Sequence, residues 1–373
     1  MNPPPEPVRS GRSPERGSAR SPARTGARAT PRRTPAQKRW ASARQAAGRA
    51  GGPGLTVAIT GADTGLGLQL AQRLTAHPEV TAVRPIAGGE PLVAGLLAGA
   101  TVLVHLEISF AAEPTVANVP VAAAALDAAG RAAVPRVVLC TSAMVYGADE
   151  ANPLPLDEDA PLRAVAERGL VAELLEIEEL ARSARPGGAP GLTVVRPAML
   201  VGAGLDTALT RHFEAGRLLH LQGARPAWQF CHVDDLLAAL EYAALGKVSG
   251  AVTVGCEGWL EQEDVELITG IRRMTLPASL AFSAAERRAR FGVGAPASDL
   301  RYIAYPWVVS SDRLRTAGWR AAYDNASALQ AMLRDLSARQ TPGHRASLGA
   351  AGAAVAMMGT AAILRQARRR RRA

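Results

Sequence analysis

The stretch that decides the fold is Leu55–Leu70, LTVAITGADTGLGLQL. It begins with an apolar, β-branched run over residues 55–60, a pattern typical of a fully buried strand. The glycine-rich segment 61–67 follows, and apolar residues then recur with helical spacing. A strand, a glycine turn and a helix form the first unit of a dinucleotide-binding fold. The alternative is a tight strand-to-helix turn that needs glycine for its geometry alone.

The glycines of this turn have separate expected roles. Gly61 allows the tight turn, Gly65 lets the backbone approach a pyrophosphate, and Gly67 lets the helix pack closely on the strand. The free amides at the start of the helix, assisted by the helix dipole, would face the phosphates. The predicted cofactor-binding turn also includes Asp63, Thr64 and Leu66.

Charge is distributed unevenly along the 373 residues. The formal net charge is +10, but residues 1–49 alone contain twelve basic and two acidic residues, and the last nine residues contain six arginines. The remaining residues, 50–364, hold 25 basic and 31 acidic residues. We therefore expect a mildly acidic folded part, and a 48% hydrophobic composition is enough to give it a sizeable core.

Residues 1–54 are rich in Pro, Arg, Ser, Gly and Ala. Such a segment buries too little apolar surface to offset its ordering entropy, so we expect a disordered basic arm. The arm could bind an anionic partner or a membrane surface, and an inert tail is the alternative. No apolar segment typical of a secretory signal follows, and three cysteines without a zinc-type cluster favour a cytoplasmic protein without a metal.

Further buried runs alternate with helical ones after the glycine turn. Val80–Arg84, Thr101–Leu106 and Val137–Thr141 have strand patterns, and Val119–Ala133 has a helical pattern between the second and third of these. Strands that alternate with helices indicate an α/β fold with a doubly wound parallel sheet of the Rossmann type.

Arg84 lies where NAD-binding chains usually carry an acidic residue for the adenosine ribose. The local sequence, Val83–Pro85, contains no acid. Arg84 is therefore a candidate contact for the 2′-phosphate of NADP, and a solvated surface arginine is the alternative. NAD and NADP both stay open as cofactors, with a lean to NADP.

An ordered set of motifs resembles the extended short-chain dehydrogenases/reductases, the NAD-dependent epimerase/dehydratase group that acts largely on nucleotide sugars. The motifs are TGADTGLG, VLVHLE, PRVVLCTSAMVYG after the helix that opens at Asn118, TVVRPAMLVG, FCHVDDLLAAL and RLRTAGWRAAYDNASALQAML. They cover about residues 55–336. The resemblance implies a dinucleotide-binding Rossmann domain, a small C-terminal lobe and a nucleotide-sugar-like substrate.

The resemblance also implies roles for individual residues. Ser142 matches the serine that hydrogen-bonds the reacting hydroxyl or carbonyl, and a polar residue that ends a strand is the alternative. The positions that match cofactor contacts are His105, Leu106 and Pro197. Glu107 stands where the family often has an alanine close to the cofactor. The run His232–Asp235 matches a substrate-side loop before a helix, and we expect Asp235 to be that helix's N-cap.

The family's catalytic pair, a Tyr and a Lys in the pattern YxxxK, is absent. It would fall in residues 161–176, PLRAVAERGLVAELLE, which contain neither residue type. A phenol has a pKa near 10, so it needs a neighbouring cation to transfer protons near neutral pH. Tyr242 and Lys247 have the wrong spacing and lie later in the chain. The first candidates for a substitute base are Tyr146 and Glu167.

The helix expected after residue 169 is amphipathic. Its apolar face contains Leu170, Leu174, Ile177 and Leu180. We therefore expect its glutamates to form the exposed side. They are Glu173, Glu176, Glu178 and Glu179. A carboxylate acid or base on this helix is the alternative.

The expected organisation has four parts. They are a basic arm (1–54), a Rossmann domain (55–197) to which 229–256 return, a substrate-side lobe (198–228 and 257–340), and an apolar helix with a polyarginine end (345–373). Within the last part, residues 346–364 are uncharged for 19 positions, long enough to span a bilayer. Because most of them are Ala and Gly, insertion would be marginal, and a peripheral or protein-packed helix is the alternative.

The predicted function is an NAD(P)-binding protein of epimerase/dehydratase or reductase type with an atypical or lost catalytic pair. A non-catalytic NAD(P)-sensing or scaffold protein is the alternative. We expect a cytoplasmic protein, with membrane association through the C-terminal helix and a homodimer as open alternatives.

Overall fold

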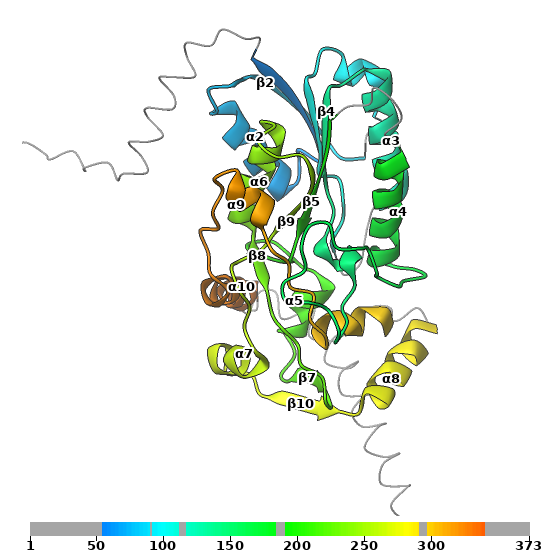
Figure 1. The fold of residues 1–373 in the computed structure, drawn as a ribbon, viewed down its shortest axis with the longest axis vertical. Helices are drawn as coiled ribbons and strands as arrows, with labels where there is room; N and C mark the ends of the chain where they lie inside the picture. Colours follow the sequence, from blue (N-terminus) through cyan, green and yellow to red (C-terminus); the bar gives the residue numbers. More distant parts are fainter. Residues whose placement is uncertain (1–53, 90–91, 112–116, 184–190, 291–296, 340–373) are drawn as a thin grey trace, which may run out of the picture. The chain divides into compact units, whose positions relative to one another are not determined.

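The structure, a computed structural model, describes residues 54–89, 92–111, 117–183, 191–290 and 297–339 (Figure 1). All of them belong to one unit, residues 51–373. The predicted basic arm, apart from Gly54, and the predicted C-terminal apolar helix lie outside the described residues.

A six-stranded parallel sheet forms the centre of this unit. Its strands lie in the order β2-β1-β3-β4-β5-β9. Their bounds are Leu55–Thr60 (β1), Val80–Ile86 (β2), Val102–His105 (β3), Arg136–Cys140 (β4), Gly191–Pro197 (β5) and Gly250–Val254 (β9). The chain runs outward from β1 to β2 and then returns to the other side of β1. This reversal between β1 and β3 is a topological switch point, and the doubly wound α/β fold expected from the sequence is confirmed.

Helices cover both faces of the sheet. The helices α2 (Gly65–Thr75) and α6 (Val233–Ala244) pack together on one face, and α3 (Asn118–Arg131) and α4 (Leu170–Ser183) pack together on the other (Figure 1). Val57 and Ile59 of β1 belong to the same core cluster as Leu70 of α2, whereas Ala58 belongs to the cluster that contains Ala122 of α3. Burial on both faces explains why the strands are apolar runs rather than alternating patterns.

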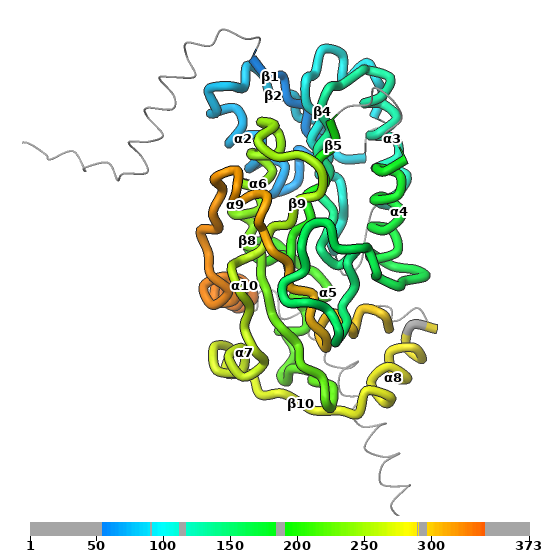
Figure 2. Tube along the Cα trace, viewed as in Figure 1, coloured from blue at the N-terminus to red at the C-terminus, as the bar shows by residue number. Residues whose placement is uncertain are grey.

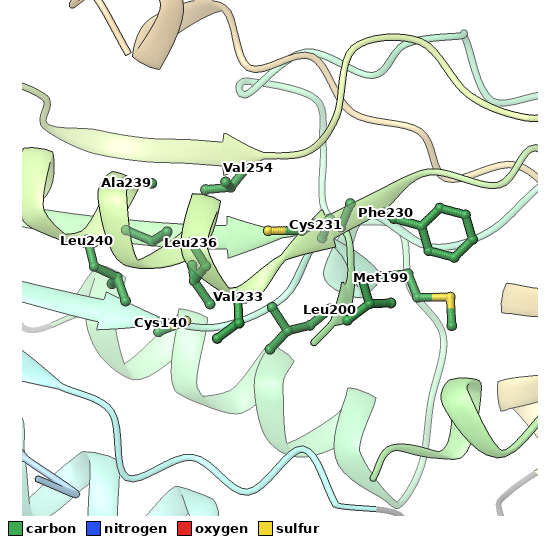
Figure 3. Packing of buried hydrophobic residues seen from close by; sticks show 14 of the residues in the cluster. Cys140, Met199, Leu200, Phe230, Cys231, Val233, Leu236, Ala239, Leu240 and Val254 are labelled. Atoms are coloured by element: carbon green, nitrogen blue, oxygen red, sulfur yellow. The ribbon is translucent and has the colours of Figure 1, made fainter. Parts of the chain in front are cut away.

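The core between α6 and the sheet is tightly apolar. Figure 3 shows Leu236, Ala239 and Leu240 of α6 beside Cys140 of β4 and Val254 of β9. The three cysteines of the chain are buried free thiols. Burial raises the pKa of Cys140 to about 12, so this thiol stays protonated and packs as a small apolar side chain.

The remaining elements extend beyond the carboxyl edge of the sheet or pack beside it. Two parallel strand pairs lie here, β6 (Met199–Val201) with β8 (Phe230–His232) and β7 (Leu218–Leu221) with β10 (Arg273–Leu276). The helices are α5 (Ala208–His212), α7 (Gln262–Thr269), α8 (Ala278–Arg290), α9 (Asp312–Thr316) and α10 (Asn325–Arg339). The 3-10 turns are η1 (Ala94–Leu97), η2 (Ala143–Tyr146) and η3 (Ala297–Ile303). Figure 2 shows how α9 and α10 return late in the chain to lie beside β9 and β8.

Within the described ranges, no helix combines the length and the apolar character that crossing a bilayer requires.

Candidate functional site

The glycine turn after β1 has a backbone path that other residues would not fit. Gly61 has a φ of +65°, and a Cβ there would lie 3.2 Å from the backbone nitrogen of Glu107. A Cβ on Gly67 would lie 2.1 Å from the carbonyl oxygen of Gly61. At Gly65, by contrast, a Cβ would have no atom within 4 Å. The turn is therefore closed towards the protein and open over Gly65.

The start of α2 presents amides to this open space. Thr64 is the N-cap, and its Oγ1 accepts a hydrogen bond from the Gly67 amide (3.1 Å) and donates one to the Gly61 carbonyl (2.7 Å). Gly65 and Leu66 are the first two helical residues, so their amides have no intrahelical acceptor. Two such amides at the positive end of an 11-residue helix are suited to a phosphate group.

Two carboxylates come together at the end of β2. Asp63 Oδ1 accepts from the Gly88 amide (2.8 Å), and Glu107 Oε1 accepts from the Gly89 amide (2.6 Å). A Cβ on Gly88 would lie 3.3 Å from Glu107 Oε1 and 3.4 Å from Asp63 Oδ1. Within the described part of the chain, neither carboxylate has a basic partner.

Arg84 lies within β2, before the end of the strand where Asp63 and Glu107 meet. It is two residues from the end of β2, pairs with Ala58, and donates from Nη1 to the carbonyl of Ala98 at the end of η1. The structure thus brings Asp63 and Glu107 together at the end of β2 and places Arg84 elsewhere. The sequence placed the end of this strand at Arg84, two residues before its observed end at Ile86.

His105 and Leu106 support the turn from below. Both are buried, and His105 Nδ1 lies 2.7 Å from Thr60 Oγ1, which joins the carboxyl ends of β1 and β3. His105 Nε2 is buried and has no hydrogen-bond partner among the described residues. Burial lowers the pKa of His105 to about 4, so the ring is neutral at physiological pH.

A cavity of about 240 Å³ lies beyond the carboxyl ends of β3, β4 and β5. Its walls are mostly apolar, with a few polar side chains among them. The lining residues are Ser109, Phe110, Ala111, Asn118, Ser142, Met144, Gly169, Leu170, Glu173, Pro197, Ala198, Met199, Leu200, Thr207, Ala208, Leu209, Asp299 and Trp307. Of the residues named from the sequence, Ser142 and Pro197 line this cavity, as do Leu170 and Glu173 of the predicted amphipathic helix. Tyr146 and Glu167 do not line it.

Ser142 is held in place by its backbone neighbours. It is the N-cap of η2, and its Oγ accepts from the Met144 amide (3.2 Å) and donates to the Pro197 carbonyl (3.4 Å). The side chain is 5% exposed. The hydroxyl therefore faces the cavity with its hydrogen bonds already directed into the protein.

Helix α4 presents Gly169, just before its start, Leu170 and Glu173 to the cavity. None of these is a phenol or a cation. Asn118, fully buried at the start of α3, donates from Nδ2 to Glu173 Oε2 (2.6 Å) and accepts at Oδ1 from the Ser109 amide (2.8 Å). Asn118 belongs to no catalytic motif, and its position at the start of a helix was the only signal in the sequence.

A second carboxylate enters the cavity from η3. Asp299 accepts a hydrogen bond from Ser298 Oγ (3.3 Å), and burial raises its pKa to about 6. Nothing in the local sequence distinguishes this aspartate from a surface residue, so it was not anticipated. The cavity therefore contains two carboxylates, Glu173 and Asp299, from distant parts of the chain.

The prediction that all four glutamates of α4 form its exposed side is wrong for Glu173, which is half-buried and lines the cavity, and for Glu178. Glu178 is buried and forms a bidentate ion pair with Arg196, with Oε1 and Oε2 each 2.8 Å from a guanidinium nitrogen. Glu178 also accepts from Thr141 Oγ1 (2.8 Å). The helix packs against β5 over more than its apolar stripe, and Arg196 provides the charge that allows Glu178 to be buried there.

Tyr146 belongs to the same network. Its hydroxyl donates to the Glu158 carbonyl (3.0 Å) and accepts from Arg196 Nη1 (2.7 Å). Burial raises the pKa of Tyr146, although Arg196 offsets part of that effect. Glu167, the other candidate substitute base, lies before α4 on the exposed surface. Neither residue is among those that line the cavity.

The prediction that Asp235 caps α6 is wrong. The N-cap is His232, whose Nδ1 accepts from the Asp234 amide (3.2 Å). Asp235 lies inside the helix and accepts from the backbone amides of Ala322 (2.6 Å) and Tyr323 (3.3 Å). Its carboxylate thus connects α6 to the segment that leads into α10.

Tyr242 and Lys247 interact with each other away from the cavity. Tyr242 is on α6 and Lys247 follows its end, and the Lys247 Nζ lies 4.8 Å from the centre of the Tyr242 ring. The sequence contains one other lysine, Lys38, which is outside the described residues. A Tyr–Lys pair therefore exists in this chain only as a surface contact, as far as the described residues extend.

The parallel sheet, its covering helices and the glycine turn are those of a Rossmann-type α/β fold. Residues 91–255, less than half of the chain, match the model of the NAD dependent epimerase/dehydratase family, in agreement with the resemblance seen in the sequence over that segment. Uncharacterised proteins of Mycobacterium tuberculosis and Mycobacterium bovis are 28% identical over 184 residues, 48% of this chain and 48% of each relative. The chain thus matches about half the length of these relatives.

Several solved structures share the fold. A Bacillus cereus UDP-glucuronic acid 4-epimerase in complex with NAD is 13% identical, with a TM-score of 0.55, over 77% of this chain and 100% of that chain. The Bordetella bronchiseptica enzyme WbmG in complex with NAD is 18% identical, with a TM-score of 0.53, over 78% and 96%. MoeE5 in complex with UDP-glucose and NAD is 19% identical, with a TM-score of 0.54, over 76% and 99%. At these identities the similarity establishes the fold.

Proposed function

We propose that this chain binds a nicotinamide dinucleotide at the carboxyl edge of its sheet and holds a small molecule in the adjoining cavity. The observation that carries the proposal is the open space over Gly65, at the start of a helix whose first amides lack intrahelical acceptors. The domain match over residues 91–255 and the NAD found in complexes of similar folds support the same ligand.

The residues of the glycine turn would have different roles in binding the pyrophosphate. The amides of Gly65 and Leu66 would donate to its oxygens, while Thr64 keeps the Gly67 amide occupied and the helix start rigid. Pro197, which lines the cavity, would lie against the nicotinamide end. When bound, the dinucleotide supplies hydride transfer at its nicotinamide ring.

The end of β2 favours NAD over NADP. A ribose with free 2′- and 3′-hydroxyls can donate hydrogen bonds to the carboxylates of Asp63 and Glu107. A 2′-phosphate brought to the same place would meet two negative charges that no described basic residue compensates. Arg84, the sequence-based reason for a lean to NADP, is bonded to the Ala98 carbonyl instead.

The protein is proposed to be of epimerase/dehydratase or reductase type without the usual Tyr–Lys chemistry. The similar folds include proteins solved with UDP-glucose, so nucleotide-sugar-like molecules are the reference substrates. On these we expect slow or no turnover, because α4 presents Gly169, Leu170 and Glu173 where a phenol and a cation would be needed.

A second candidate function is a non-catalytic NAD-sensing or scaffold protein. The observation that favours it is the same α4 surface, because a carboxylate cannot take over the charge of a lysine beside a phenol. Ligand binding without turnover would support this candidate, and robust dinucleotide-dependent turnover of any substrate would support the enzyme.

Thermal and chemical denaturation of the full chain with NAD and NADP tests the proposal. Ligand at a hundred times its dissociation constant should stabilise the folded state by about 2.7 kcal/mol. Gly65→Val should lose this stabilisation because its side chain would fill the space over the turn. Gly95→Val is a matched control, since Gly95 also has open space around its Cβ position but lies in η1.

The dinucleotide proposal fails if neither NAD nor NADP, oxidised or reduced, stabilises the wild-type chain at millimolar concentration. The NAD preference fails separately if NADP stabilises the chain as much as NAD does. Glu107→Gln should reduce the difference between the stabilisation by NAD and the stabilisation by NADP. Glu79→Gln, at the opposite end of β2, should leave it unchanged.

A further inference from the structure

The cavity beyond the carboxyl ends of β3, β4 and β5 has an unusual balance of charge for a site that would hold a nucleotide sugar. Its walls carry two carboxylates, Glu173 and Asp299. Among the described residues that line it, none is Arg, Lys or His.

The protein orients the Glu173 carboxylate but provides a hydrogen-bond donor to only one of its two oxygens. Asn118 holds one carboxylate oxygen, Oε2, at 2.6 Å, while Oε1 has no partner among the described residues. Glu173 also lies in the first turn of α4, where its charge complements the positive end of the helix dipole. The start of this helix is therefore already occupied by an anion of the protein itself.

Asp299, which lies in η3 much later in the chain, is also only partly satisfied by hydrogen bonds. One oxygen, Oδ1, accepts from Ser298, and Oδ2 has no partner in the described ranges. Asp299 is half-buried, and a partly desolvated carboxylate without a cationic partner is costly, so a donor brought by a ligand would lower that cost. Both carboxylates thus offer an acceptor oxygen to the cavity.

The arginines nearest the cavity in sequence are engaged elsewhere. Arg196, next to Pro197, is paired with Glu178 (2.8 Å). Arg211 of α5 is paired with Asp206 (2.7 Å) and Arg301 of η3 with Asp149 (2.7 Å). Arg168 precedes Gly169 and is exposed. No arginine is among the described residues that line the cavity and could meet a diphosphate.

We propose that the cavity takes a small, mostly apolar molecule without negative charge, which donates hydrogen bonds from a hydroxyl or an ammonium group to Glu173 and Asp299. A nucleoside diphosphate sugar does not fit this description, because its two negative charges would be buried beside two carboxylates. This inference rests on the proposed function and names the substrate class of the same site.

Three probes that share one ring test the inference: cyclohexylamine, cyclohexanol and cyclohexanecarboxylate, with UDP-glucose as a competitor. Binding to the full chain with saturating NAD is measured by ligand-observed NMR at a pH where the amine is protonated. We expect the amine to bind most tightly, the alcohol next and the carboxylate at least about tenfold more weakly than the amine. UDP-glucose should not displace the amine.

Two variants connect the result to the cavity. Glu173→Gln and Asp299→Asn should each reduce the preference for amine over carboxylate by about tenfold, with a smaller change for the alcohol, because only a charge is removed. Glu176→Gln is the matched control, since Glu176 is exposed on the same helix. Arg168→Ala should not change the binding of any probe.

The inference is overturned if the carboxylate probe binds best, if UDP-glucose displaces the amine and this competition depends on Glu173 or Arg168, or if neither amine nor alcohol binds at high millimolar concentration. Stabilisation by NAD, measured on the same samples, separates this result from the proposed function. Probe binding in the expected order without any effect of NAD would contradict the dinucleotide proposal and leave the cavity assignment standing.

Discussion

The glycine turn and the α4 side of the cavity lie at the same edge of the sheet, but their geometry restricts the sequence to different degrees. In the turn, backbone atoms occupy the positions where a Cβ on Gly61 or Gly67 would lie, so the chain path itself excludes other residues. On α4, positions 170 and 173 need only side chains that fit beside a cavity. A surface made of backbone can therefore persist while the side-chain chemistry next to it changes.

The largest effect should come from breaking the buried pair behind the cavity. Glu178→Ala leaves the Arg196 guanidinium buried without its partner, and we expect a loss of about 3–5 kcal/mol in the free energy of unfolding. Denaturant titration measures this loss. Glu176→Gln, an exposed change on the same helix, should stay within about 0.5 kcal/mol of the wild type. A small loss for Glu178→Ala would mean that α4 is not fixed by this pair.

The stability of the chain should depend on pH through two histidines, His105 at the glycine turn and His212 of α5. Burial lowers the pKa of both His105 and His212 to about 4, against an ordinary value of 6.5. The unfolded chain therefore binds more protons between these values, so stability is fully present above about pH 6.5 and is lost as the pH falls towards 4. We expect each histidine to account for about 2 kcal/mol of the loss between pH 7 and pH 5.

Denaturation at both pH values, repeated for His105→Gln and His212→Gln, checks this dependence. Each substitution should remove its own share of the pH-dependent loss. If the wild type and both variants lose the same free energy of unfolding between pH 7 and pH 5, other titratable groups dominate the pH dependence.

Within the turn itself, neighbouring glycines should respond differently to the same substitution. Gly67→Ala places a Cβ against the Gly61 carbonyl and should cost about 1–3 kcal/mol of stability. Gly65→Ala adds a Cβ in open space and should stay within about 0.5 kcal/mol. Urea denaturation of the two variants measures the difference. Similar costs at both positions would contradict the view that the turn is closed on one side only.

The smallest effect is expected on the catalytic side. Ser142→Ala should change any nicotinamide-dependent turnover little, because the Ser142 hydroxyl hydrogen-bonds only backbone groups among the described residues. A positioned acid or base is typically worth roughly 10²–10⁴-fold, and none is hydrogen-bonded to Ser142 there. Initial rates with nucleotide sugars and NAD test this expectation. A robust epimerase or dehydratase activity that Ser142→Ala abolishes would contradict it, and Glu173 and Asp299 would then be the next residues to replace.

The fold could be predicted from the sequence because its signals are local. The run Leu55–Thr60, the turn after it and the helix spacing beyond each depend on residues within one turn or strand. The buried, uninterrupted strands indicated a sheet covered on both faces. The strand ends were less accurate, since Ile86 extends β2 through its pairing with Thr60, a contact 26 residues back in the chain.

The site could be predicted only in part because its polar contacts join distant segments. Ser142 follows a recognisable motif, but Asp299 reaches the same cavity from 157 residues later, and no local pattern marks it. Glu178 looked exposed on a helical wheel, and only Arg196 on a neighbouring strand explains its burial. Likewise, the absence of YxxxK is readable from the sequence, whereas the carboxylates present instead are visible only in three dimensions.

The contact between Lys247 and Tyr242 has a practical consequence for labelling. Lys247 is exposed after α6, and the sequence offers only Lys38 as a second lysine side chain. Amine-reactive dyes would therefore mark the described part of the chain at a single point between α6 and β9, away from the glycine turn and the cavity. A fluorophore attached there would lie close to the Tyr242 ring, which can quench it. It would report on the region where β9 begins, without blocking the glycine turn or the cavity.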